Sequence, residues 1–211
     1  TRGAIKHTLL GGLELGLQRT ENFRNTGYFN NTATSIQVPY AAPTIQTPVT
    51  FRQSATDADN HLRTQLAGIY VQDQIEFSPA WQAVLGLRWD EFALDYYNHR
   101  TGEHLRRVDQ LVSPRAGLVF KPHPSVSAYA SLSVSHLPSS GDQFSSLTTV
   151  TEQVKPERFL NRELGLKWEP SRTLAITTAI YQLDRTNTRA TDPADPTRIL
   201  QTGSTRTSGA E

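Results

Sequence analysis

Long stretches in which apolar and polar residues alternate constrain the fold of this chain more than any other feature of its sequence. In residues 112–135, VSPRAGLVFKPHPSVSAYASLSVS, the alternation runs on both sides of a turn that contains two prolines. Successive side chains of a β-strand point to opposite faces, so this stretch predicts a hairpin with one apolar face. The pattern recurs along the chain, without helical periodicity of comparable length.

The alternation predicts seven strands and the beginning of an eighth. They lie near residues 6–20, 64–76, 81–97, 109–121, 125–137, 161–169 and 172–186, and the eighth begins near 205. The joints after the second, fourth and sixth strands are short and contain proline, which indicates tight turns; they span 77–80, 122–125 and 170–172. The remaining joints are long and polar, and they span 21–63, 98–108, 138–160 and 187–204.

The length and the faces of these strands favour a membrane wall over a soluble sandwich. Several are about twice the ~5–6 residues usual in soluble sheets, which is the length of a tilted spanning strand. In 81–97, Trp81, Leu85 and Trp89 share one face, while Arg88 and Asp90 lie on the other. Burying those charges inside a sandwich would be costly, whereas a wide barrel exposes them to a polar lumen.

We therefore predict an all-β fold, in which antiparallel strands form part of the wall of a large transmembrane β-barrel with its apolar faces in lipid. The alternative is an ordinary soluble β-domain with an aromatic core. The strand at 172–186 carries apolar residues on both faces, so its pattern alone does not orient it.

Composition excludes several other classes of protein. Only 36% of the 211 residues are hydrophobic and the mean hydropathy is −0.48, so no run approaches the ~20 apolar residues of a spanning helix. The 21 basic and 20 acidic residues are dispersed, which leaves no basic stripe for nucleic acid. Cysteine is absent, which excludes disulfides and cysteine-based zinc sites. Because the sequence starts without Met, we expect a piece of a longer protein.

Motifs for catalysis are missing, and we do not expect an enzyme. The sequence has no cysteine nucleophile, no G-x-S-x-G and no H-E-x-x-H. His99, Glu103 and His104 imitate a metal site, but a solvated loop cluster is the favoured interpretation because short motifs match by chance so often. DPADP at 192–196 is interpreted as a turn.

Four segments resemble a known family of bacterial receptors. LAGIYVQDQIEFSPAWQAVLGLRWDEF (66–92), LVSPRAGLVFKP (111–122), LPSSGDQFSSL (137–147) and KPERFLNRELGLKWEP (155–170) are similar to the C-terminal β-barrel of TonB-dependent outer-membrane receptors. The similarity is greatest to the ferric-siderophore branch of catecholate type.

This resemblance implies a location in the bacterial outer membrane and energy-dependent uptake of a ferric siderophore. It also implies long extracellular loops, an N-terminal plug, and contact with the TonB complex through a box before the plug. Neither the plug nor the box is expected in this stretch. About a third of a barrel wall would have two open edges, so we predict that the stretch does not fold alone. A passive porin-like channel and a macromolecule-binding barrel or adhesin remain as alternatives.

The ligand would be an anionic and aromatic iron complex, and no resident cofactor is expected. Such a complex favours arginine for charge and aromatic rings for stacking. The long-loop end supplies both types, and the residues predicted to contact the ligand are Tyr96, Tyr97, Arg100, Arg106, Arg107, Gln143 and Phe144. The alternative is a solvated loop tip that binds nothing.

Overall fold

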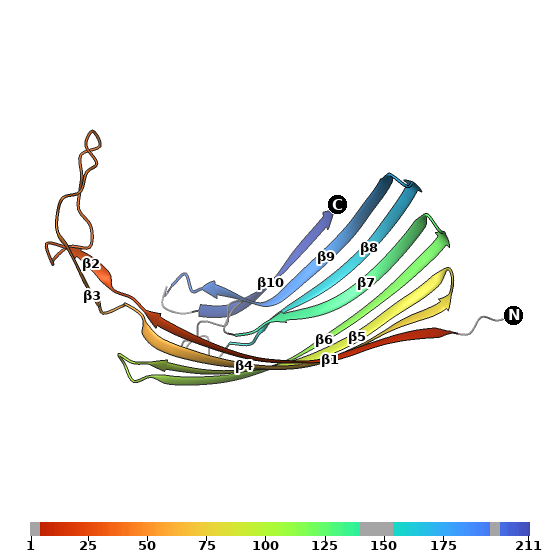
Figure 1. Ribbon diagram of the computed structural model, residues 1–211, viewed down its shortest axis with the longest axis horizontal. Coiled ribbons are helices and arrows are strands. Elements are labelled where there is room, and N and C mark those ends of the chain that lie inside the picture. The colour runs from red at the N-terminus through yellow and green to blue at the C-terminus, as the bar shows by residue number, and fades with distance from the viewer. Residues whose placement is uncertain (1–4, 140–153, 195–198) are drawn as a thin grey trace.

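One antiparallel sheet of eight strands dominates the computed structural model, which describes residues 5–139, 154–194 and 199–211. Its strands, in their order across the sheet, are β1 (Lys6–Phe23), β4 (Asp59–Ser78), β5 (Trp81–Asn98), β6 (His104–His123), β7 (Val126–Leu137), β8 (Glu157–Ser171), β9 (Leu174–Thr191) and β10 (Ile199–Ala210). The sheet is strongly curved and open, with β1 and β10 at its edges (Figure 1). The predicted all-β, antiparallel barrel wall is confirmed.

None of the described residues forms a helix that is long and apolar enough to cross a membrane.

The tight turns lie at one end of the sheet, as the sequence predicts. Residues 79–80, 124–125 and 172–173 connect β4 to β5, β6 to β7 and β8 to β9. In the first of these turns, the hydroxyl of Ser78 accepts hydrogen bonds from the backbone N–H groups of Ala80 and Trp81, at 3.3 and 3.1 Å. A side chain that accepts from the backbone two or three residues later stabilises such a turn without help from the rest of the sheet.

The opposite end, which we call the long-connection end, differs from expectation at 98–108. There β5 and β6 continue, and residues 99–103 alone form the connection. Asp95 pairs with Arg106 and Tyr96 with Leu105 across the two strands. His104 and Arg106 find their partner, Asp95, on the neighbouring strand, so the barrel wall extends further than the polar composition suggests.

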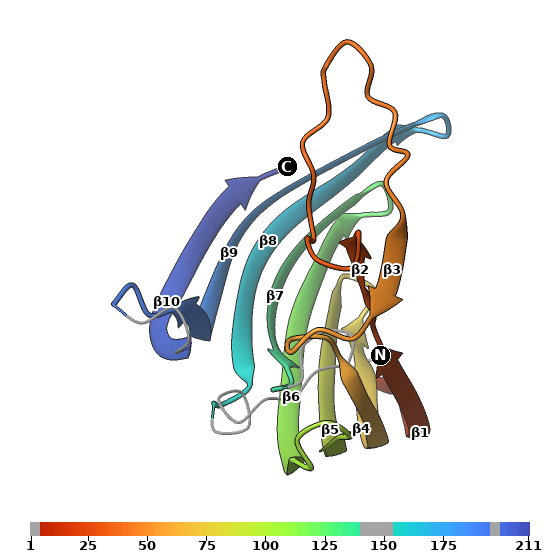
Figure 2. The same ribbon diagram turned by 90° about the vertical axis from the view of Figure 1, so that its left-hand side faces the viewer.

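A second, small sheet within residues 24–58 was not predicted. It joins β2 (Thr26–Phe29) to β3 (Val49–Arg52), and Figure 2 shows the connecting segment extending away from the large sheet. The guanidinium of Arg52 lies 3.7 Å from the centre of the Tyr28 ring, an attractive cation–π contact. Strands of only four residues are too short to be recognised from the alternation of apolar and polar residues.

The apolar side of the large sheet, which we call the outer face, is not buried in a protein core. Trp81, Leu85, Leu118 and Leu166 are between 42% and 51% exposed. The other large apolar side chains exposed there include Leu9, Leu13, Leu15, Leu17, Ile69, Val71, Leu87, Val112, Leu132, Leu164 and Trp168. A soluble domain would bury such a surface, because exposed patches of this size promote aggregation. The soluble alternative is therefore wrong.

The register also orients β9, which the sequence left open. Ile176 pairs with Trp168 and Ile180 with Leu164, so both isoleucines lie on the outer face. Both are also exposed, at 43% and 57%. Tyr181 pairs with Glu163 and therefore points to the opposite, inner face.

Tyrosines on the inner face lie over glycines of neighbouring strands. The cross-strand pairs are Gly12 with Tyr70, Gly165 with Tyr129, and Gly209 with Tyr181. A Cβ atom added to these glycines would approach the tyrosine side chains to 2.3, 2.3 and 2.5 Å, respectively. Only glycine leaves room for the rings. In return, each ring covers the backbone of a glycine that has no side chain of its own.

A buried apolar cluster lies on the inner face toward the long-connection end. It consists of Leu62, Phe92, Leu94, Tyr96, Leu105 and Leu111, with Leu66 packed against it. All of these residues share one side of the β4–β5–β6 ladder. This cluster packs the side chains of β4, β5 and β6 against one another near the long-connection end.

Candidate functional site

Charged side chains form a network across the inner face. The guanidinium of Arg88 on β5 contacts the carboxylates of Asp90 and of Glu14 on β1, each at 2.6 Å. It also lies 5.8 Å from the centre of the Tyr70 ring. Gly68 makes room for this network, because a Cβ there would come within 2.7 Å of Asp90 and 2.9 Å of Arg88. The network holds one cation in a fixed position on a polar wall.

Arg115 on β6 is a second inner-face cation, and it has no ion pair or side-chain hydrogen bond to the described residues. Its side chain lies over Gly86, where an added Cβ would meet the Arg115 side chain at 2.8 Å. Arg88, Arg115, Tyr70 and Gln72 line a hollow of about 280 Å³. This hollow presents two cations and a phenol on one surface, a combination suited to an anionic or aromatic ligand.

Closer to the long-connection end, buried carboxylates position further arginines. Arg107 contacts the fully buried Asp109 at 2.7 Å, and Asp109 accepts a hydrogen bond from the backbone N–H of Ser139 at 2.7 Å. Arg189 donates to the carbonyl oxygen of Ser139 at 2.9 Å. Two other nitrogens of Arg189 are buried and have no partner among the described residues. Arg189 falls within an expected loop, so the sequence pattern did not single it out.

Asp57 anchors the base of the 24–58 connection. Its carboxylate accepts from the backbone N–H of Ser54 at 2.7 Å, from Arg24 at 2.7 Å and from the hydroxyl of Thr26 at 2.8 Å. These hydrogen bonds, with the Ser54 N–H making the largest contribution, hold the pKa of Asp57 well below its usual range despite its burial. The guanidinium of Arg100 donates to the backbone carbonyls of Ala55 and Asp57, which ties the 99–103 turn to the same base.

The family follows from a comparison with known proteins. A family model described as TonB dependent receptor-like, beta-barrel matches residues 1–211. The chain belongs to this family. It is therefore a wall segment of a receptor β-barrel of the bacterial outer membrane, and its family is one of receptors and transporters rather than of enzymes.

Siderophore receptors are among the relatives of this receptor barrel. "Probable TonB-dependent receptor BfrD" of Bordetella pertussis is 33% identical over 170 residues, which cover 75% of this chain and 23% of that protein. "Probable TonB-dependent siderophore receptor PiuA" of Acinetobacter baumannii is 27% identical over 99% of this chain and 31% of that protein. The chain thus spans about a quarter to a third of the length of these relatives.

Solved structures confirm the fold of the receptor barrel. The crystal structure of the siderophore receptor PiuA from Acinetobacter baumannii superposes with a TM-score of 0.78 and 24% identity, covering 100% of this chain and 33% of that one. The Ferric-Catecholate import receptor Fiu of Escherichia coli K12, in its closed form, gives 0.72 and 19%, with coverage of 98% and 32%.

The residues predicted to contact ligand do not form one pocket in the receptor barrel. Tyr96 is buried in the inner-face cluster, whereas Tyr97 lies on the outer face. Arg106 lies on the outer face and Arg107 on the inner face. Arg100 binds backbone carbonyls in the turn. Gln143 and Phe144 lie outside the described residues, and contact with ligand stays a prediction for the whole set. Because residues 98–108 were expected to form a loop, the strand alternation that places consecutive side chains on opposite faces was not applied to them.

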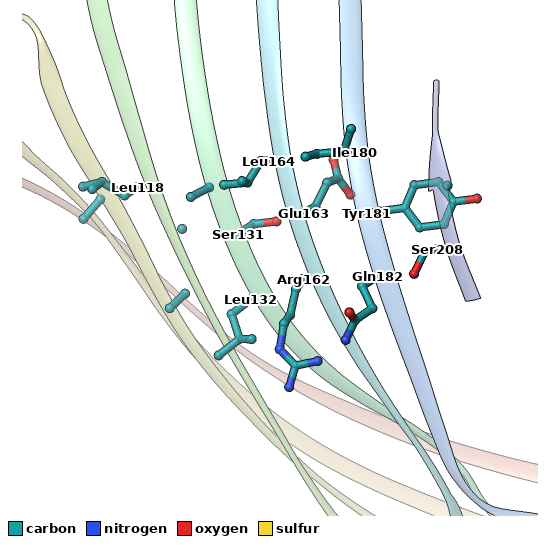
Figure 3. Close-up of a pocket in the computed structure, with 15 residues that line it drawn as sticks. Leu118, Ser131, Leu132, Arg162, Glu163, Leu164, Ile180, Tyr181, Gln182 and Ser208 are labelled. Carbon is teal, nitrogen blue, oxygen red and sulfur yellow. The ribbon is translucent and has the colours of Figure 1, made fainter. Parts of the chain in front are cut away.

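Another hollow of the receptor barrel lies mainly on its outer face. It has a volume of about 810 Å³, and Ala83, Ala116, Leu118, Leu164 and Ile180 contribute to its lining. Figure 3 shows the lining side chains spread over neighbouring strands instead of converging on one centre. Because most of this lining is apolar and belongs to the lipid-facing surface, we assign the hollow to contact with lipid and not to a charged ligand.

The histidine-rich turn of the receptor barrel is arranged differently from the sequence motif. His104 contacts the carboxylate of Asp95 at 2.9 Å. His99 instead approaches His61 of β4, and Glu21 of β1 lies beside them. The sequence motif thus named one member of a group whose other members are 38 and 78 positions away, as the spacing of Glu21, His61 and His99 shows.

Proposed function

We propose that the complete receptor takes up ferric siderophore complexes across the outer membrane, and that this chain supplies eight adjacent strands of its wall. The observation that carries the proposal is the family match over the whole chain, joined to a sheet that is apolar outside and charged inside. A relative named as a siderophore receptor aligns with 99% of the chain.

The chemistry of the inner face supports an anionic cargo. Arg88, Arg107 and Arg115 all lie on this face, distributed over β5 and β6. Carboxylates on the same face pair with Arg88 and Arg107, whereas Arg115 has no ion pair among the described residues and is the cation available to an anionic complex. A cation beside a low-dielectric wall attracts an anion more strongly than one on an open surface does. Tyr70 adds an aromatic ring beside these cations, which suits a catecholate-type complex.

The proposal includes the direction of transport and its source of energy. In bacterial barrels, short turns face the periplasm and longer connections face outward, so the long-connection end would receive the cargo. Energy would come from the TonB complex acting on a plug domain of the complete protein. The inner-face charges described above would then face the plug at rest and the cargo during transport.

Iron uptake tests this function directly. A strain lacking the receptor gene, and the same strain with the gene restored, would receive radioactive iron bound to one siderophore at a time, from a panel that includes catecholates. We expect gene-dependent uptake of at least one complex, and we expect an uncoupler that collapses the proton gradient to abolish it. Gene-dependent uptake that survives the uncoupler would indicate a passive channel. No gene-dependent uptake from any complex would contradict the proposal.

A further inference from the structure

Three metal-ligating side chains meet on the outer face at the long-connection end. They are Glu21 from β1, His61 from β4, and His99 from the turn between β5 and β6. Their ligand atoms all lie within 4.8 Å of one another. Nδ1 of His61 and Nε2 of His99 are only 3.2 Å apart. The group is close in space although its members come from three separate parts of the sequence.

The spacing of the two imidazole nitrogens fits a shared metal ion. Zinc binds histidine nitrogen at about 2.0–2.1 Å, so two nitrogens 3.2 Å apart subtend an angle of about 100° at one zinc ion. That angle is close to tetrahedral. The carboxylate of Glu21 is exposed, and rotation about its side-chain torsions can bring an oxygen to a third position. The fourth position would be open to water.

Backbone contacts hold the two histidines in place. Glu21 and His61 are direct cross-strand partners. The backbone N–H of His99 donates to the carbonyl of Asp59 at 2.9 Å, which fixes the turn against the start of β4. Gly102, with a φ of 71°, closes that turn and donates to the carbonyl of Asn98 at 2.9 Å. Tyr97 packs against both imidazoles, with ring centres at 5.5 and 5.3 Å. The two nitrogens share a hydrogen bond at 3.2 Å, and a bound ion would replace it, because imidazole binds metal through a deprotonated nitrogen.

The donor set selects a class of metal. Two imidazoles and one carboxylate suit zinc and neighbouring transition metals, whereas calcium and magnesium require mainly oxygen ligands. Arg19 and Arg63 lie on the same face, one cross-strand pair below. Their positive charge repels a metal ion. The ion must therefore be held by coordination to the imidazole nitrogens and not by electrostatic attraction alone. Glu21 and His61 also line an open hollow of about 530 Å³, which gives the ion access from solvent.

We propose that Glu21, His61 and His99 form a binding site for a divalent transition-metal ion, with zinc as its natural type, on the outer surface of the receptor wall. The bound ion joins the end of β1, the start of β4 and the 99–103 turn, and so clamps the base from which the 24–58 connection leaves the wall. The site is separate from the inner face and does not depend on which siderophore the receptor carries.

Zinc stoichiometry of the full-length receptor tests this site. The receptor would be purified in detergent, stripped with a chelator, and titrated with Zn²⁺ in competition with a chromophoric zinc indicator. We expect the wild type to bind one Zn²⁺ more per chain than the variant His61→Asn/His99→Asn. We expect Glu21→Gln to bind Zn²⁺ more weakly than the wild type, by at least the roughly ten- to hundredfold that loss of even an outer-shell partner costs. Equal stoichiometry in the wild type and the double variant would overturn the proposal.

A matched control and a second measurement distinguish loss of the metal site from loss of folding. His7→Asn/His123→Asn removes two exposed histidines from the other end of the sheet, and it should leave the stoichiometry unchanged. Substitution with Co²⁺ gives visible absorption bands that report four-coordinate nitrogen and oxygen ligands. Those bands should be present in the wild type and in the control and should disappear in His99→Asn. Bands that persist in His99→Asn would contradict the assignment.

Discussion

At the scale of single residues, the face to which an arginine points decides what it can bind. Arg106 and Arg107 are consecutive, yet Arg106 contacts Asp95 on the outer face at 2.8 Å and Arg107 contacts Asp109 on the inner face at 2.7 Å. Arg115 shares the inner face with Arg107. A ligand inside the barrel can therefore meet Arg107 and Arg115, but not Arg106.

Replacing Arg115 by alanine should weaken uptake of the ferric siderophore by about tenfold, equivalent to about 1.4 kcal/mol. The reason is the loss of an inner-face cation that has no ion pair among the described residues. Radioactive-iron uptake by cells that express the full-length receptor measures the effect. Arg106→Ala, on the same strand but on the outer face, is the matched control and should have little effect. Equal losses from both substitutions would show that the faces are wrongly assigned.

The lowered pKa of Asp57 predicts that the stability of the base of the 24–58 connection depends on pH. Its pKa is lower in the folded protein than in the unfolded chain, so its stabilising effect is complete above about pH 4 and declines as the pH falls further. Hydrogen exchange at the Ser54 amide, corrected for the intrinsic rate, should therefore be faster at pH 2.5 than at pH 6. In Asp57→Ala it should be about tenfold faster already at pH 6, because the charged acceptor is lost. The same pH response in both proteins would exclude Asp57 as the cause.

At the scale of strands, local alternation predicted which segments pair and which face is apolar. It succeeded for 81–97 because each side chain there follows the period of two, and the register confirms the assignment. It failed at 104–108, where Arg106 pairs with Asp95 of the neighbouring strand and Arg107 pairs with Asp109 of its own strand. Contacts between distant segments, such as His61 with His99, leave no local pattern and could not be predicted.

The tyrosine-over-glycine pairs give a prediction at this same scale. Gly12→Ala should destabilise the full-length receptor by about 1–3 kcal/mol, because the new Cβ would lie 2.3 Å from the Tyr70 ring and force it to move. Gly11→Ala is the control on the adjacent outer-face position, where the nearest atom is 3.7 Å from the new Cβ. Urea unfolding in detergent measures both. A control as unstable as Gly12→Ala would mean that strand propensity, not ring contact, is responsible.

At the scale of the whole molecule, the sheet is a wall between two environments. One face exposes leucine, isoleucine and tryptophan, and the other carries the Arg88 network and the buried cluster. Neither edge of the described sheet is closed, since β1 and β10 each have one neighbour. Both facts have the same explanation, which is that lipid covers the outer face and the remaining strands of the receptor complete the barrel.

The direct test of this account is the accessibility of spin labels in the full-length receptor in lipid vesicles. This stretch contains no native cysteine, so labels can be attached through Leu85→Cys and Leu118→Cys on the outer face, and through Ser131→Cys and Gly117→Cys on the inner face. We predict that the outer labels collide with oxygen dissolved in the bilayer and are shielded from a water-soluble nickel complex. The inner labels should not show this preference for oxygen. Outer labels that meet the nickel complex as readily as the inner ones do would contradict the placement of the apolar face in lipid.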